Sequence, residues 1–251
     1  MTALALVVAT ALAAGCSGDK NTAKQTLHPL VPKEQVSSIA KQGNDYLVAW
    51  AGVLVNPNRW HFGENLSALI SARDAAGREV VHFEQSLDAI APSGSLAFSG
   101  TATTATRPVN VKISYRPVTW RHVARIPSAF KPFEVSEVHT EKLKNGAYLV
   151  TGYVSDPFRK AVGSLTVTAL LHDQNGKLLG GDGDFVDNID PGARRRFVIT
   201  VDGVKAPVAG DKTRVYASTW GSTARTYQEL ALAGAVPVNT VKPKTPPFSK
   251  E

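Results

Sequence analysis

Four consecutive residues, Arg59, Trp60, His61 and Phe62, form the stretch of the sequence best suited to contact a ligand. Aromatic rings beside a guanidinium group are typical of interaction hot spots and of platforms on which sugars stack. We therefore predict that this stretch is a loop that carries more of the binding than any other. Its counterpart at residues 158–160 holds a single aromatic residue. The alternative is that Trp60 and Phe62 fold back onto the edge of a sheet.

A second candidate for chemistry is the acidic stretch that contains Asp182, Asp184, Asp187 and Asp190. Because Ca²⁺ takes about six to eight oxygen ligands, a calcium loop is one interpretation. The spacing after Asp184 misses the calcium-loop pattern, however. In an extended strand, Asp182 and Asp184 would also point to one face and Asp187 to the other. We favour a solvated strand followed by a turn, without a bound metal.

Other catalytic and metal-binding patterns are absent from the sequence. The six histidines have neither the HxH nor the HExxH spacing: His28, His61, His82, His122, His139 and His172. The single cysteine excludes a disulfide framework and a site with several cysteine ligands. There is no GxSxG, P-loop or CxxC motif. We expect no catalytic residue and no cofactor, and an enzyme of unfamiliar type is the least favoured interpretation.

The net charge of +7 is spread along the chain. A nucleic-acid-binding domain usually concentrates Lys and Arg on one folded face, so we expect no nucleic-acid partner. The tightest basic run, at residues 194–196, begins an expected strand and its side chains would alternate between faces. Solvated charges at a strand end are the favoured interpretation, and a patch for anionic lipid or wall polymer is the alternative.

The N-terminus suggests where the protein works. Residues 1–15 are uncharged, and their apolar run is shorter than the about 20 residues that a membrane span needs. They suit a secretory signal, although no Lys or Arg precedes the apolar run. The junction Leu12-Ala13-Ala14-Gly15-Cys16 resembles a bacterial lipobox. That resemblance implies that Cys16 is lipidated and anchors an extracytoplasmic lipoprotein to the membrane, with residues 16–34 as a polar tether.

The remainder of the chain contains a sequence repeat, at residues 35–121 and 134–221. Matched landmarks lie 99 to 102 residues apart, and they include Tyr46-Leu47-Val48 with Tyr148-Leu149-Val150, Asp74 to Arg78 with Asp173 to Lys177, and Thr119-Trp120 with Thr219-Trp220. One change of offset, by two residues, falls inside an expected strand and leaves every side chain on its original face. Residues 122–133 are expected to be a linker. Residues 222–251 are expected to be a partly disordered tail with one short helix at 223–233.

Each repeat shows the alternation of apolar and polar residues that is typical of antiparallel strands, with turn residues between. We predict an all-β protein of two tandem immunoglobulin-like sandwiches, each with about seven strands. Trp120 and Trp220 are expected to cover the base of each core.

The repeat unit resembles the FxLYD-type and related immunoglobulin-like domains of bacterial surface lipoproteins. The resemblance rests on the Tyr-Leu-Val strand with its following Asn/Asp-Pro, the Asp-x-x-Gly-Lys/Arg turn, and the later Ile-x-Pro stretch followed by Phe. It implies a non-catalytic binding or spacer module. The expected function is therefore interaction with an extracytoplasmic protein partner, and binding of carbohydrate or cell-wall polymer is the alternative.

Overall fold

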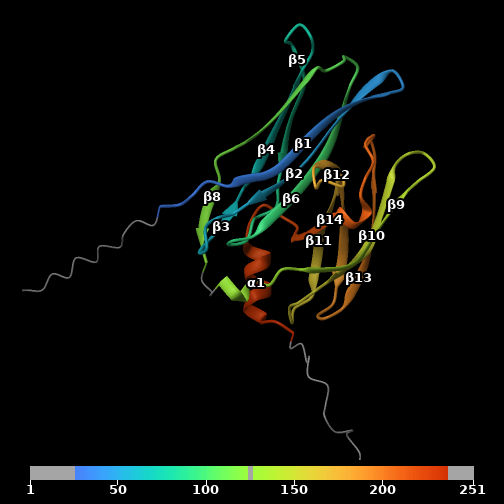
Figure 1. Ribbon diagram of the computed structural model, residues 1–251. Helices are drawn as coiled ribbons and strands as arrows, with labels where there is room; N and C mark the ends of the chain where they lie inside the picture. The colour runs from blue at the N-terminus through green and yellow to red at the C-terminus, as the bar shows by residue number, and fades with distance from the viewer. Residues whose placement is uncertain (1–25, 124–126, 237–251) are drawn as a thin grey trace, which may run out of the picture.

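The computed structural model describes residues 26–123 and 127–236. Over these residues the chain forms fourteen strands in antiparallel sheets and one α-helix (Figure 1), so the predicted all-β class is confirmed. The strands are β1 (Val31–Gln42), β2 (Asp45–Val55), β3 (His61–Glu64), β4 (Ser67–Arg73), β5 (Glu79–Ser86), β6 (Ser95–Thr104), β7 (Asn110–Tyr115), β8 (Thr119–His122), β9 (Glu134–Lys142), β10 (Tyr148–Ser155), β11 (Val162–His172), β12 (Leu178–Ile189), β13 (Arg194–Val201) and β14 (Arg214–Thr219). The helix α1 (Arg225–Ala233) lies where the sequence predicts one.

The two halves of the described chain share one strand order. The first half has sheets β1-β2-β6 and β5-β4-β7, and the second half has the corresponding sheets β9-β10-β13 and β12-β11-β14. The halves differ in one sheet, because β3 and β8 pair with each other only in the first half. The described strands therefore number eight in the first half and six in the second, where about seven were expected in each.

The repeated glycine–phenylalanine pair shows that the correspondence extends to side-chain packing. In the first half a Cβ atom on Gly52 would lie 2.8 Å from Cζ of Phe98. In the second half a Cβ atom on Gly152 would lie 2.6 Å from Cζ of Phe197. Each ring therefore lies directly over the backbone of the neighbouring strand, and only glycine leaves room for it.

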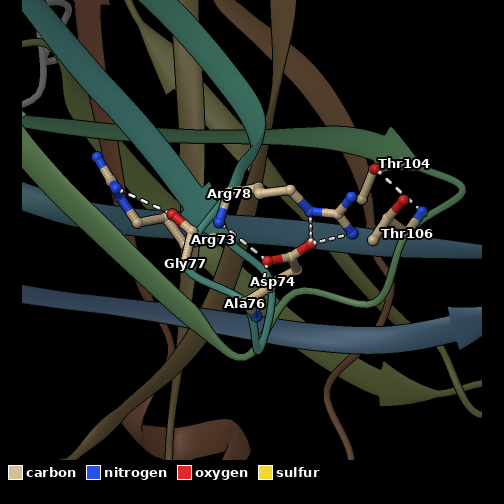
Figure 2. A network of polar contacts seen from close by, with 7 residues as sticks. All are labelled: Arg73, Asp74, Ala76, Gly77, Arg78, Thr104 and Thr106. Carbon is tan, nitrogen blue, oxygen red and sulfur yellow. Dashed lines mark hydrogen bonds and ion pairs between the residues drawn. The ribbon is translucent and has the colours of Figure 1, made fainter.

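The turn between β4 and β5 is repeated as the turn between β11 and β12. Asp74 accepts hydrogen bonds of 2.9 Å from the backbone N–H groups two and four residues later, and Asp173 does the same. Gly77 and Gly176 have φ angles of +80° and +78°, which favour glycine. In the first half, Nε of Arg78 also donates to Asp74, at 2.8 Å (Figure 2). The predicted turn chemistry is therefore present in both halves.

The two halves pack face to face, so that four sheet layers follow one another. Sheet β1-β2-β6 lies between sheet β5-β4-β7 and the second half, and it contacts sheet β12-β11-β14. Alternate residues of β2 serve two cores: Trp50 and Leu54 face the core of the first half, whereas Ala51 and Val53 face the second half. This arrangement explains why residues 46–55 are apolar on both faces.

Glycines of β12 lie at this contact. A Cβ atom on Gly181 would lie 2.6 Å from the carbonyl oxygen of Ala169 in β11, so glycine is needed there for the packing of the neighbouring strand. Across the contact between the halves, Cβ atoms on Gly181 and Gly183 would lie 3.4 Å from Cβ of Ala51 and 3.7 Å from Oγ of Ser99, which are ordinary van der Waals distances. The acidic stretch considered as a calcium loop lies in β12, at the contact between the halves, up to Ile189, and Asp190 follows the strand.

The expected linker and the start of the expected tail are packed parts of the fold. Phe130 and Phe133 are buried, and with Tyr227 of α1 they join Phe62 and Phe158 in one aromatic cluster. We refer to these five side chains as the aromatic joint, because it contains residues of both halves. The segment expected to be a linker thus also contributes to the core, because its aromatic residues are apolar enough to enter it.

The expected boundaries at the two ends also change. Strand β1 begins at Val31, inside the segment expected to be a tether, and His28 exchanges hydrogen bonds with the side chain of Asn58. The signal segment, Cys16 and residues 237–251 lie outside the described residues.

Candidate functional site

Phe62 does not belong to a ligand-facing loop. It lies in β3, which pairs with β8, and its side chain is fully buried. Its ring packs edge-on against Phe130, with 4.9 Å between centroids, and against Tyr227 at 5.9 Å. The proposed binding role of Phe62 is therefore wrong, because the ring is part of the aromatic joint. The alternative considered for Phe62, that it folds back into the core, is the arrangement found.

The other residues of that stretch are divided between core and surface. Trp60 is half-buried and packs against the core of the second half, while the exposed Arg59 lies over its ring, 5.7 Å from the centroid. His61 packs edge-on against His122, with 5.1 Å between centroids. Burial, and then the charge of His122, lower the pKa of His61. Arg59 and the outer side of Trp60 are thus the accessible part of the predicted binding stretch.

The most exposed large apolar side chain of the described residues is Trp220, at 61%. The expectation that it covers the base of a core is wrong, and the strand register gives the reason. Thr219 pairs with Leu165 in the second half, whereas Thr119 pairs with Glu64 in the β3–β8 pair. The two Thr-Trp pairs therefore occupy different places in the fold, although their sequences match.

Trp220 is exposed but held in place by the first half. The backbone N–H of Gly221 donates to Oδ1 of Asp88 at 2.8 Å, and the N–H of Ala89 donates to the carbonyl of Gly221 at 2.9 Å. The Trp220 ring also packs edge-on against Phe185, with 6.2 Å between centroids. Phe185 is itself 54% exposed. The two rings form a fixed aromatic platform, which we name the Phe185–Trp220 pair.

A crevice of about 220 Å³ lies beside this pair, between the two halves. Its walls come from β5 and β6 of the first half and from β11 and β12 of the second. Besides the two rings, polar side chains line it: Gln85, Ser86, Asp88, Ser99, Thr166, Thr168, Asp182 and Asp184. The crevice therefore combines aromatic surface, hydroxyl groups and carboxylates, and residues from both halves complete it.

The carboxylates of the crevice have different roles. Asp88 is engaged in hydrogen bonds within the protein, because the Ser218 hydroxyl also donates to it, at 2.9 Å. Asp182 is partly buried, and this burial raises its pKa, to which repulsion from Asp202 and Asp184 adds, while a hydrogen bond from Gly183 opposes the shift. A cationic group of a ligand would relieve this repulsion and could lie against the aromatic rings.

Neither Phe185 nor Trp220 was predicted to face a ligand. A signal was present, because Phe185 directly follows the polar and glycine-rich residues 180–184. What could not be foreseen is that β5 and β6 of the first half would bring the opposite wall. The structure therefore assigns the candidate site to the contact between the halves.

Over residues 26–123 and 127–236, no three His, Cys, Asp or Glu side chains are grouped so that they could hold a metal ion. No helix in the described part of the chain has the length and apolar character of a membrane span. No protein-family model matches the chain, and no curated protein matches it either.

Proposed function

We propose that the chain is a non-catalytic lipoprotein of a bacterial envelope, anchored through Cys16, whose two immunoglobulin-like modules bind an extracytoplasmic protein partner. The supporting observation is the exposed Phe185–Trp220 pair beside the carboxylates of Asp182 and Asp184. Exposed, rigid aromatic residues are a recurrent centre of protein–protein interfaces. The two-module description rests on the shared strand order of the halves and on their repeated turns.

The chemistry of the crevice favours a partner that inserts a basic side chain. A Lys or Arg side chain can place its charge against Asp182 and Asp184 while its stem covers the Phe185–Trp220 pair. Arg59 and Trp60 provide a second, smaller contact surface in this proposal. Phe62 contributes only by holding the fold.

A carbohydrate or cell-wall polymer is the second candidate ligand for the same crevice. Aromatic faces stack on sugar rings, and the hydroxyl groups of Ser86, Thr166 and Thr168 can exchange hydrogen bonds with those of a sugar. Titration of residues 17–251 with peptidoglycan fragments, followed by isothermal titration calorimetry, tests this candidate. A saturable change that Trp220→Ala abolishes would favour the sugar ligand over the protein partner.

Photo-cross-linking in the organism's own cells tests the protein partner. A photoreactive phenylalanine analogue in place of Phe185 is expected to give a discrete protein adduct. The same analogue in place of Leu232, which is 59% exposed on α1, is the matched control. Adding Trp220→Ala should weaken partner binding by roughly 30-fold or more, because a buried interface Trp contributes about 2 kcal/mol or more. Equal adducts at both positions would contradict the proposal.

The anchor is tested separately. Cys16→Ser is expected to release the protein from the membrane fraction after a high-salt wash, since salt removes the attraction between basic residues and anionic lipid. If the variant stays with the membrane after that wash, lipidation of Cys16 is not the anchor.

A further inference from the structure

Two adjoining hollows lie where the β1–β2 and β9–β10 hairpins end. The first has a volume of about 630 Å³ and is lined by Lys41, Tyr46, Arg107 and Lys205, together with apolar residues. The second has a volume of about 330 Å³, and Lys205 also lines it. In Figure 1 the two hairpins, in blue and yellow-green, point to the same side of the molecule. The orange loop that carries Lys205, between β13 and β14, lies between them.

The two halves provide equivalent groups to these hollows. Lys41 pairs with Tyr46 across the β1–β2 hairpin, and Lys142 pairs with Tyr148 across the β9–β10 hairpin. The second hollow is lined by Lys142 and Tyr148, and Nζ of Lys142 lies 5.6 Å from the centroid of the Tyr148 ring. The duplicated hairpins thus place the same cation–phenol combination on either side of Lys205.

The positive charge of the hollows is not neutralised by the fold. Lys41, Arg107, Lys142 and Lys205 are all exposed, and among the described residues none of the four forms an ion pair. The carboxylates closest in sequence line neither hollow: Asp45, Glu141 and Asp202. Four cations that face a concave surface without carboxylates raise the local concentration of anions.

We propose that these two hollows form one anion-binding groove, which takes an extended polymer chain that carries phosphate groups. Lysine ammonium groups and the Arg107 guanidinium are suited to phosphate oxygens. The cations extend over two neighbouring hollows, and together these offer more room than one small anion fills. The groove uses none of the residues of the Phe185–Trp220 crevice, so this inference does not rest on the proposed function.

The form of the groove favours a polymer over a membrane surface. The first hollow is lined by residues of both halves, and the second by residues of the second half alone. A flexible chain can enter such hollows, whereas a flat bilayer surface cannot follow them. It offers little aromatic surface for bases, because the Tyr148 ring is buried and covered by Lys142, which leaves only the half-buried Tyr46. The expected ligand is therefore recognised mainly by its phosphate groups.

Binding of inorganic polyphosphate to residues 17–251 tests the groove. We expect saturable binding that weakens steeply with salt, because salt screens exposed charges. The double variant Arg107→Glu/Lys205→Glu should lower the affinity by about tenfold or more. Lys112→Glu/Lys177→Glu is the matched control, since it makes the same change in net charge at two exposed residues that line neither hollow. All variants should keep the melting temperature of the parent. If Arg107→Glu/Lys205→Glu lowers it, the double variant Arg107→Gln/Lys205→Gln is used instead.

Two results would overturn the inference. In the first, the Arg107→Glu/Lys205→Glu variant and the Lys112→Glu/Lys177→Glu control bind polyphosphate equally, which would mean that overall charge is sufficient. In the second, vesicles of phosphatidylglycerol bind the parent as tightly as polyphosphate does and lose binding to the same double variant. That result would make the basic residues a membrane contact. Neither result would affect the cross-linking test at Phe185, so the two proposals fail independently.

Discussion

Asn56 in the first half and Asp156 in the second occupy the same place in their repeats and differ in one terminal atom. Both are buried, and each accepts a hydrogen bond from the backbone N–H two residues later, at 2.9 Å and 2.8 Å. The Asn56 amide also donates to the carbonyls of His61 and Ala91, at 2.7 Å and 3.0 Å. Oδ2 of Asp156 has no hydrogen-bond partner among the described residues.

At this position the two halves share the backbone geometry, while the balance of polar groups differs between them. Burial raises the pKa of Asp156, opposed only in part by the hydrogen bond from Phe158. A buried carboxylate oxygen without a partner costs free energy of folding. At this position the second half therefore contributes less stability than the first, although the turn is the same.

The largest expected effect tests whether the two halves can be compared as separate units at all. Tyr227 packs against both Phe62 and Phe158 in the aromatic joint. Because Tyr227→Ala removes this contact to both halves, we expect a loss of about 3–5 kcal/mol in the free energy of unfolding. Differential scanning calorimetry should show one transition that moves as a whole. Leu232→Ala, on the exposed side of α1, is the control and should leave the transition temperature unchanged.

Two separate transitions, of which Tyr227→Ala shifts only one, would contradict this expectation. The halves would then fold independently, and the aromatic joint would belong to one of them.

The next largest effect comes from making the first half resemble the second. Asn56→Asp removes the two hydrogen bonds that the amide donates and places a carboxylate against two carbonyl oxygens. We expect a destabilisation of about 2–3 kcal/mol at neutral pH, measured by urea denaturation. Asn44→Asp, at an exposed turn position, is the matched control for the added charge. Equal stability of Asn56→Asp and the parent would mean that the buried amide is not needed.

The reverse change, Asp156→Asn, is expected to stabilise the protein by about 1 kcal/mol at neutral pH. The sign follows from the raised pKa. Folding disfavours the ionised form of Asp156, so its cost is absent in acid and grows as the pH rises above the ordinary value of 3.8. Urea denaturation at pH 3 and pH 7 should therefore show the gain only at pH 7. A gain of the same size at both values would assign it to packing instead.

The smallest effect is expected from Asp182, which stands where the first half has Phe83. Asp182→Asn should raise the melting temperature slightly at neutral pH, because burial and repulsion from Asp202 and Asp184 raise the pKa of Asp182. The rise is small because the side chain is only partly buried. The same variant should reduce cross-linking at position 185. Asp190→Asn, exposed and outside the crevice, should change neither quantity.

The features that the sequence predicted are those set by local chemistry. The Asp74 and Asp173 turns and the short helix α1 each follow from a few neighbouring residues, and all are present. The face-to-face contact of the halves could not be predicted, because an apolar outer face does not say what covers it. The crevice depends on that contact, so Trp220 and Phe185 could not be recognised as a site. The expectation for Trp220 that came from the Thr-Trp match was wrong, because the two identical dipeptides lie in different strand pairings.

The alternation of β2 between two cores has a consequence for how this gene can evolve. Among the described residues, its odd-numbered face, with Ala51 and Val53, packs against Leu170 and Leu178 of the second half. A chain cut between the halves would expose this apolar face and favour aggregation. We therefore expect that neither half can be deleted without exposing apolar surface of the other, so that the two halves are retained together.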